Sequence, residues 1–440
     1  MSRVGFSKSR LSRRSFLGGA AVMGGGFPLL GMGTRAFAQS KVDIVSWCVA
    51  GPRFEPPQKA LIALFQKRHP NIGVTIETSP WGEFYQKVAV ALAGGATQYD
   101  TIMHDYSVLP AQAGAGWLTP LDSYIDADPD FKKSVWSDVP ENVLKLWSYK
   151  DKQYGLPPDG NTQLMYWRSD VLDKAGVKPP ETWDDVIEAA KELTGGGQYG
   201  FVCSLQRGIW DYSVFASILQ SHGGQVYDPA TFKVTLDSEQ AVKALNVLKT
   251  LLKYADPVTL NASNDDVIRS FASGRGVLAP CEWGGAGFTS PEFSKFAAQT
   301  GAGKVPKGSG PDGKHVPVMG GLAFEIPIAS QHKDEVWQWI KFIMSDDPEV
   351  QETWVKNSGQ PTRLSTLKKY AKDNVLFGAL AESLPLARPF PDFPEGTELM
   401  DKVGTEVALA LTGSKAPEQA AKDMQTQVVE IFKTAGYLKG

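Results

Sequence analysis

From residue 42 onward, short apolar runs alternate with stretches in which apolar residues recur every three or four positions. The first pair is a strand pattern at residues 42–47 and a helix pattern at 57–69, which Pro70 stops. Further strands are predicted at residues 73–77, 99–103, 154–156, 163–167, 199–203, 276–279 and 320–328. Further helices are predicted at 82–93, 109–114, 182–193, 238–254, 265–272, 332–344, 348–356, 398–411 and 417–435. This alternation predicts an α/β fold, and the glycine-, lysine- and proline-rich stretch 300–313 is expected to be a loop.

The first 38 residues differ from the rest of the chain in charge, because they contain six Lys and Arg and no Asp or Glu. Ser12-Arg13-Arg14-Ser15-Phe16-Leu17 resembles the twin-arginine export signal. The apolar stretch that follows, 18–32, is diluted by six glycines and is too short to span a membrane. Ala36-Phe37-Ala38 has the form of a leader-peptidase site. Residues 1–38 are therefore predicted to be a signal peptide, the alternative being a basic amphipathic start.

Removal of that segment changes the charge of the remaining chain. It takes six bases from 45 and leaves the 48 acids, so residues 39–440 carry a net charge of −9. This acidity and the lack of a basic cluster argue against a nucleic-acid partner. A second long apolar run is also missing, which predicts a soluble periplasmic protein that we expect to be a monomer. The three cysteines form no CxxC pair, so neither a disulfide framework nor a zinc site is predicted.

Two glycine-rich segments have the spacing of nucleotide-binding motifs but lack their context. Residues 308–314 fit a phosphate-binding loop, yet His315 stands where a Ser or Thr must hold Mg²⁺. Residues 195–200 fit G-x-G-x-x-G but follow a helix and precede a strand, which is the reverse of the dinucleotide order. The chain has no G-x-S-x-G or H-E-x-x-H, and its five histidines are scattered. We predict no cofactor, no metal and no catalytic residue.

Six short motifs, in a fixed order, connect the chain to a known family. They are Tyr99-Asp100-Thr101-Ile102-Met103-His104-Asp105 with Gly116-Trp117-Leu118-Thr119-Pro120-Leu121-Asp122, Tyr154-Gly155-Leu156-Pro157, Tyr166-Trp167-Arg168-Ser169-Asp170-Val171-Leu172 with Ala175-Gly176, Pro179-Pro180-Glu181-Thr182-Trp183-Asp184, Gly320-Gly321 and Gly359-Gln360-Pro361-Thr362-Arg363. With them, residues 41–440 resemble the family 1 extracellular solute-binding proteins, the maltose-binding-protein-like receptors of carbohydrate ABC importers. One departure is Trp167-Arg168, where the family more often has Tyr-Asn.

The resemblance implies a two-lobed periplasmic-binding-protein fold with discontinuous lobes joined by hinge crossings. The expected lobes are 40–153 with 322–365, and 154–321 with 366–440. The crossings are expected near 153–160, 316–321 and 361–369. A ligand held between the lobes would shift an open-to-closed equilibrium, and a membrane permease would recognise the closed form.

Candidate ligand-binding residues follow from the rule that ligands of open α/β sheets sit beyond the carboxyl ends of strands. Sugars suit flat aromatic walls combined with planar polar groups. The candidates near strand ends are Trp47, Trp81, Glu83, His104, Asp105, Trp210 and Trp283. Those at the crossings are Asp159, Asn161, Gly320, Gly321 and Arg363. The two glycines would let the backbone approach the ligand.

Each candidate also has a structural interpretation. The tryptophans could belong to the core, Asp105 could cap the next helix, and Asp159 and Asn161 could be polar groups of a hinge. Arg363 could form an ion pair between the lobes. Trp117 and Trp183 are assigned to packing, and one of Trp337 and Trp339, two apart on one helix, is expected to be exposed.

The function that the sequence favours is a non-enzymatic periplasmic receptor for a saccharide or polyol. A rival from another class is a secreted glycoside hydrolase that uses Glu83 and Asp105 as its carboxylates. A third interpretation is a receptor for iron or a phosphate ester, for which His104, Arg363 and the more distant Arg53 are the available groups.

Overall fold

The structure is a computed structural model that describes residues 41–51 and 53–438. The predicted signal peptide lies outside these residues. No helix of the described part is long and apolar enough to cross a membrane.

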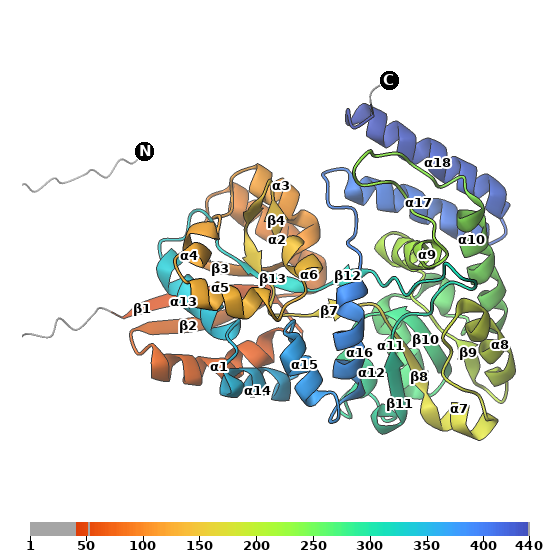
Figure 1. The fold of residues 1–440 in the computed structure, drawn as a ribbon, viewed down its shortest axis with the longest axis horizontal. Coiled ribbons are helices and arrows are strands. Elements are labelled where there is room, and N and C mark those ends of the chain that lie inside the picture. The colour runs from red at the N-terminus through yellow and green to blue at the C-terminus, as the bar shows by residue number, and fades with distance from the viewer. Residues whose placement is uncertain (1–40, 52, 439–440) are drawn as a thin grey trace, which may run out of the picture. The chain divides into compact units, whose positions relative to one another are not determined.

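The first sheet has the strand order β2-β1-β3-β13-β6, formed by Ile72–Ser79, Val42–Val49, Thr101–Asp105, Leu322–Glu325 and Gly155–Leu156 (Figure 1). β1 is parallel to β2 and β3, whereas β13 is antiparallel to both β3 and β6. β13 lies beside β3 although the whole second sheet comes between them in the sequence. β6 extends the first sheet past the boundary predicted at residue 153.

Helices cover the first sheet with side chains that the apolar pattern selected. α1 (Glu55–Arg68) has prolines as its second and third residues and buries Leu61 and Phe65. It packs against α14 (Pro348–Lys356) and α13 (Lys333–Ile343), which return from the far end of the chain. The remaining helices here are α2 (Trp81–Ala93), α3 (Leu109–Gly114), α4 (Asp122–Asp126), α5 (Pro129–Trp136) and α6 (Glu141–Lys145).

The prediction that Trp337 or Trp339 is exposed is wrong. Trp337 packs against Tyr124 and Phe131, and Trp339 against Phe65. Both rings are buried, because α13 is covered on two faces by other elements. Trp183 is buried as predicted, and its indole Nε1 donates to Ser221 Oγ at 3.1 Å.

The second sheet has the order β11-β8-β10-β9, formed by Thr300–Gly303, Leu164–Arg168, Gly276–Glu282 and Tyr199–Phe201. β8 is antiparallel to both β11 and β10, and β9 is parallel to β10. The predicted loop at 300–313 is therefore wrong at its start, which forms β11. The physical reason is the ring of Trp167: a Cβ on Gly301 would overlap it, so a glycine-rich strand fits there.

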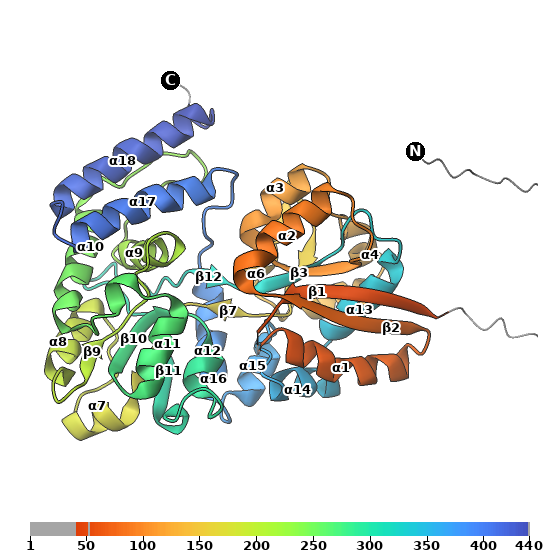
Figure 2. The same ribbon diagram turned by 180° about the vertical axis from the view of Figure 1, so that it is seen from behind.

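The helices of the second sheet include four that the sequence pattern did not predict, at residues 169–175, 209–221, 285–289 and 375–383. α8 (Trp183–Leu193) begins with the expected capping box, in which Thr182 and Asp185 each accept a backbone N–H. α9 (Ile209–Ser221) is buried along most of its length, so it lacks the polar face that reveals a surface helix. The others are α7 (Ser169–Ala175), α10 (Glu239–Leu251), α11 (Asn264–Ser273), α12 (Gly285–Thr289), α16 (Val375–Ser383), α17 (Gly396–Leu411) and α18 (Pro417–Thr434). α17 packs against α18, α9 and α10 (Figure 2).

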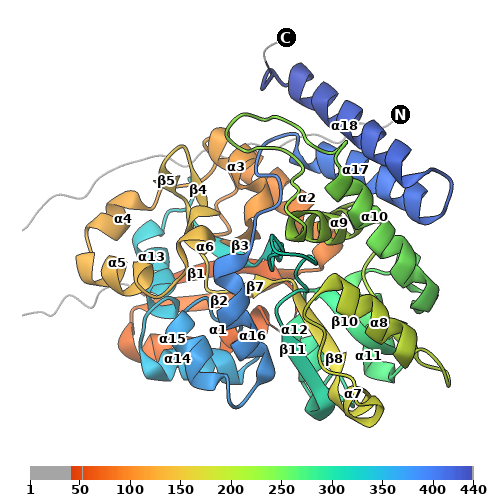
Figure 3. The same ribbon diagram turned by 45° about the vertical axis from the view of Figure 1, so that its right-hand side comes forward.

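Three chain segments run between the two sheets. β7 (Asn161–Thr162) pairs antiparallel with β12 (Met319–Gly320), and both lie between the sheets in Figure 1. The third segment, 359–363, joins them through a bridge between Asp159 and Pro361 and leads into α15 (Leu364–Tyr370). α15 packs against α16, which contacts β7 and the second sheet (Figure 3).

The strand predicted at 320–328 is split at Gly321, where the backbone turns with φ +109°. A Cβ at this position would lie 2.6 Å from the carbonyl oxygen of Asp159. Glycine is therefore required where β12 of the crossing becomes β13 of the first sheet.

Candidate functional site

Two of the three crossing segments bring strand ends of both sheets together. Asp105, the last residue of β3, pairs with Leu322, the first residue of β13. One residue back, Gly321 lies against the backbone of Asp159. The adjacent Gly320 pairs with Asn161 in the β7–β12 ladder. Four of the predicted site residues thus lie along one short path with Asp105.

Trp283 contacts the same path from the second sheet. A Cβ on Gly320 would lie 3.1 Å from both Trp283 Nε1 and Asn161 Nδ2. Trp210, at the start of α9, packs edge-on against Trp283 with 5.6 Å between ring centroids. The indole Nε1 of Trp283 is buried and has no hydrogen-bond partner within the described part of the chain. An aromatic surface and a free N–H donor therefore sit beside the amide of Asn161.

A buried carboxylate holds the turn that carries Trp283. Glu282 accepts hydrogen bonds from the backbone N–H and hydroxyl of Ser204, both at 2.6 Å, and from Asn264 Nδ2 at 2.8 Å. Asn264 also donates to the carbonyl of Trp283. Burial raises the pKa of Glu282 to about 7, against the lowering effect of Ser204 and Asn264. The preceding residue, Cys281, has φ +59°, so these bonds stabilise a strained bulge in β10.

Asp159 is the most exceptional charged group of the site. Its side chain is fully buried, and neither carboxylate oxygen has a hydrogen-bond partner among the described residues. The nearest cation is Arg53, whose Nε lies 3.4 Å from Oδ1 and is itself unpaired. Burial raises the pKa of Asp159 to about 6, and Arg53 and the backbone N–H of Leu322 partly oppose this shift. Such a carboxylate is suited to accept hydrogen bonds from a molecule bound beside it.

Asp105 and Tyr106 close the first-sheet side of the site. Asp105 accepts a hydrogen bond from the backbone N–H of Ser107 at 2.9 Å, so it caps the turn that follows, as the structural interpretation expected. Burial raises its pKa. The Tyr106 hydroxyl donates to the Met319 carbonyl and accepts from the Phe390 backbone N–H, at 3.0 and 2.9 Å. The Phe390 ring lies 6.1 Å from that of Trp283.

Three other candidates, Trp47, Trp81 and Glu83, differ in their surroundings. Trp47 is buried, stacks on Tyr99 with 4.0 Å between the ring centroids, and donates a hydrogen bond from its indole Nε1 to Ser79 Oγ. These contacts match the alternative interpretation of Trp47 as a core residue. Trp81 is 47% exposed, and its ring stacks on that of Phe54, over which the Arg53 guanidinium lies. Trp81 is therefore connected to Asp159 through Phe54 and Arg53. Glu83 is an exposed partner of Lys87 at 2.7 Å on α2.

His104 is fully buried, and its ring lies beside those of Phe84 and Tyr85 on α2. Its Nδ1 is 3.8 Å from Glu325 Oε2, a distance too long for a hydrogen bond.

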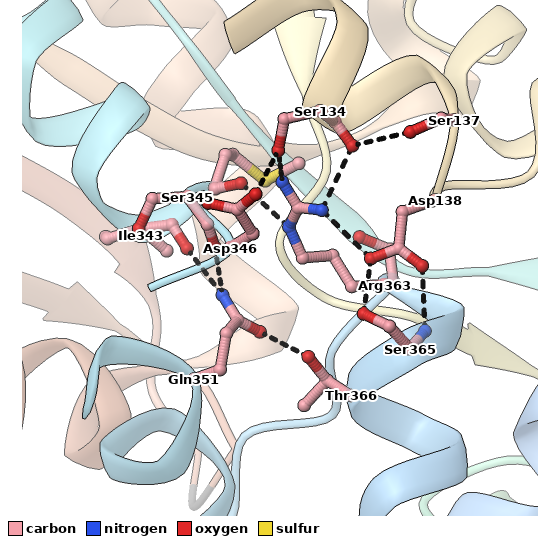
Figure 4. Close-up of polar contacts among 12 residues, drawn as sticks. Ser134, Ser137, Asp138, Ile343, Ser345, Asp346, Gln351, Arg363, Ser365 and Thr366 are labelled. Carbon is pink, nitrogen blue, oxygen red and sulfur yellow. Dashed lines mark hydrogen bonds and ion pairs between the residues drawn. The ribbon is translucent and has the colours of Figure 1, made fainter. Parts of the chain in front are cut away.

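Arg363 is engaged by the protein itself (Figure 4). Its guanidinium donates to Asp138 Oδ2 at 2.9 Å, to the carbonyls of Ser134 and Met344, and to Ser134 Oγ. Asp138 in turn accepts from the hydroxyl and backbone N–H of Ser365. The contacts match the ion-pair interpretation, although both partners belong to the predicted first lobe rather than to two lobes. Four hydrogen bonds leave this side chain little capacity for a ligand.

Comparisons with known proteins agree with this architecture. The family model of the bacterial extracellular solute-binding proteins matches residues 51–350, so the chain belongs to that family. The chain is 26% identical to the probable amino-acid ABC transporter periplasmic-binding protein y4oP of Sinorhizobium fredii, over 98% of this chain and 100% of the relative. It is 24% identical to the mannitol-binding protein of Pseudomonas aeruginosa, over 86% and 91% of the two chains.

Solved structures confirm the predicted fold class. The maltose-bound T. maritima MalE3 superposes with a TM-score of 0.76 at 25% identity, over 89% of this chain and 100% of that one. A solute-binding protein of Agrobacterium vitis S4 with bound D-mannitol gives a TM-score of 0.71 at 24% identity, over 90% and 100%.

Sequence reasoning gave Arg53 only a distant role and did not find Glu282 or Tyr106. Arg53 precedes α1 without any motif, and nothing in the sequence links it to Asp159, 106 positions away. Glu282 could have been suspected, because a carboxylate at the end of a fully buried strand needs partners.

Proposed function

We propose that this protein is the periplasmic substrate-binding protein of an ABC importer and that it captures a sugar or polyol between two lobes. One observation carries the proposal: the Trp283 indole, packed against Trp210, lies on Gly320 beside Asn161. The next residue, Gly321, lies against the backbone of Asp159, whose carboxylate oxygens have no hydrogen-bond partner among the described residues. An aromatic face with hydroxyl-binding groups at its edge suits a sugar ring or a polyol chain. A permease in the membrane would receive the ligand.

The relatives named for mannitol and maltose support this ligand class. One relative is named as a probable amino-acid ABC transporter periplasmic-binding protein, so amino acids are the ligand class to compare with sugars and polyols. The test is a thermal-shift screen of the protein against sugars, polyols and amino acids. A ligand at 100 times its Kd stabilises the folded state by about 2.7 kcal/mol. Stabilisation by an amino acid and by no sugar or polyol would contradict the proposal.

We propose that the protein acts as a receptor and does not catalyse a reaction on its ligand. Glu83, which the hydrolase hypothesis needs, is exposed on α2 and paired with Lys87, whereas Asp105 is buried and caps a turn. The ligand should therefore be recovered unchanged after prolonged incubation with the protein. Release of a shortened saccharide would favour the hydrolase.

Ligand binding is expected to bring the two proposed lobes together. The change should be carried by the crossings at 153–160 and 316–321, because β7 and β12 form only a short ladder there. Small-angle scattering with a ligand from the screen should show a smaller radius of gyration than without it. An unchanged radius, together with normal binding by Asp105→Ala, would favour a site within one lobe.

Export to the periplasm is proposed to depend on Arg13 and Arg14. Changing both to lysine should leave full-length precursor in the cytoplasm, because the twin-arginine pathway reads that pair. Fractionation and N-terminal sequencing provide the measurement. Mature protein that begins near Gln39 and accumulates in the periplasm at the normal rate would contradict this export route.

A further inference from the structure

One guanidinium and one carboxylate are the charged groups that act on Asp159. Arg53 favours its ionised form, and Asp105 opposes it. Arg53 also acts on Asp105, Tyr85 and Tyr166, and His104 acts on Asp105 as well. Glu282 on β10 adds a further acid near Tyr166. The surroundings of Asp159 thus hold more acidic than basic side chains.

The Asp159 carboxylate lacks the partners that a buried charge needs. Neither oxygen has a well-formed hydrogen bond among residues 41–51 and 53–438, because the backbone N–H of Leu322 acts on the carboxylate without reaching good hydrogen-bond geometry. The Arg53 Nε distance of 3.4 Å is also beyond a good charge-assisted bond. A buried ion without such bonds is costly, so donors supplied by a ligand would be strongly favoured. Trp283 Nε1 is a further unpaired polar atom on the neighbouring path, and it is a donor suited to a ligand oxygen.

We propose, as an extension of the function proposed above, that Asp159 accepts hydrogen bonds from two neighbouring hydroxyl groups of the ligand and makes the site selective for uncharged polyhydroxy compounds over sugar acids. Two hydroxyl donors match the two oxygens of one carboxylate. A ligand carboxylate would instead add a third negative charge beside Asp159 and Asp105, and Arg53 is the cation that acts on both of these acids. In a partly desolvated site this repulsion should weaken binding at least about hundredfold.

The hinge location of Asp159 adds a consequence. The residue forms a backbone bridge with Pro361, its carbonyl lies against Gly321, and Gly160 N–H donates to the Gln360 carbonyl at 2.6 Å. A ligand held by this carboxylate therefore contacts the crossing segments directly. Selection by charge and closure of the lobes would involve the same residue.

The test compares matched ligand pairs by calorimetry: mannitol with mannonate, glucose with glucuronate, and the tightest neutral hit of the screen with the acid formed by oxidising its terminal carbon. The neutral member should bind at least about hundredfold more tightly. Asp159→Asn should bind the neutral ligand about tenfold or more weakly than the wild-type protein. The difference between its affinities for the neutral ligand and for the acid should be smaller than in the wild-type protein. The control Asp312→Asn, at an exposed carboxyl in the 304–316 segment, should change neither.

A pH series on the wild-type protein gives a readout that folding of the variant does not affect. Hydroxyl donors favour the carboxylate, and the pKa of Asp159 in the free protein is about 6. Below pH 6 the Asp159 carboxyl of the free protein is mostly protonated and must lose its proton when the ligand binds. The affinity for the neutral ligand should therefore fall about tenfold from pH 7 to pH 5. Other titratable groups on the elements around this path are His104, Asp105, Asp211, Glu282, Glu325 and Asp392. A flat profile in Asp159→Asn distinguishes Asp159 from them.

The outcomes separate the two proposals. Equal binding of an acid and its neutral partner, or unchanged neutral binding by a folded Asp159→Asn, would overturn charge selection and leave the sugar-receptor function standing. Binding of an amino acid and of no neutral sugar or polyol would overturn both.

Discussion

Replacing Arg363 by leucine should lower the free energy of unfolding by about 3–5 kcal/mol, while the folded fraction keeps its ligand affinity. The change removes one partner of a buried ion pair and leaves the other partner in place. The side chain of Arg363 is 3% exposed and that of Asp138 17%. The carbonyls of Ser134 and Met344 would also lose their donor (Figure 4). Denaturant unfolding measures the first effect and calorimetry the second.

Arg68→Leu is the matched control for this prediction. Arg68 also binds two acids, Asp347 and Glu349, but at 35% exposure of its side chain. Exposed ion pairs of this kind contribute about 0–1 kcal/mol. A loss of affinity in Arg363→Leu without a loss of stability would restore the sequence-based hypothesis that Arg363 binds the ligand.

A small cavity lies beside Arg363 and is a second reason to expect a structural effect. It has a volume of about 10 Å³, roughly that of one water molecule, and its lining includes Trp354, Gln351 and Pro361. Leucine does not reproduce the planar head group of arginine. The variant would therefore enlarge a void between α14 and the crossing segment.

Replacing Trp283 by alanine should weaken ligand binding by about 1–3 kcal/mol, because a large desolvated aromatic contact is lost. The indole is 7% exposed and rests against Trp210 and Gly320. Its position is set by Glu282 and Asn264 rather than by the indole itself, so the turn should persist in the variant. Calorimetry with the tightest hit of the screen measures the change.

Trp136→Ala controls for the removal of an indole at another place. Trp136 ends α5 and is half-buried against the first-sheet core, well apart in sequence from the site. It should leave affinity unchanged even if stability falls. Unchanged affinity in Trp283→Ala would show that Trp283 does not contact the ligand. A strongly lowered melting temperature of this variant would show that Trp283 belongs to the core.

Several elements could be predicted from local sequence because their causes are local. Residues 109–114 and 348–356 are helices with the predicted bounds. The Thr182–Asp185 capping box is present, and the glycines at 195–197 all have positive φ after the end of α8. In each case the deciding interactions are made within a few residues of the chain.

Other features depended on partners distant in the sequence. Residues 300–303 form a strand because the ring of Trp167 covers glycines that local rules assign to a loop. α9 carries little periodic signal because other elements surround it. Trp337 and Trp339 are both buried because α13 is covered from two sides.

The sequence by itself predicted the α/β class and the family, which are confirmed, and the positions of many elements. The strand ends at which a ligand would bind stay a prediction. The sequence could not sort the candidates at those ends, because a tryptophan in the core and one beside a ligand have the same local pattern. Trp47 stacks on Tyr99, whereas Trp283 keeps a free N–H beside Asn161. Only the tertiary structure engaged Arg363 with Asp138 and left Asp159 buried beside Arg53 without hydrogen bonds. The physical reason is that burial and hydrogen-bond satisfaction are set by groups from distant segments, which local sequence does not specify.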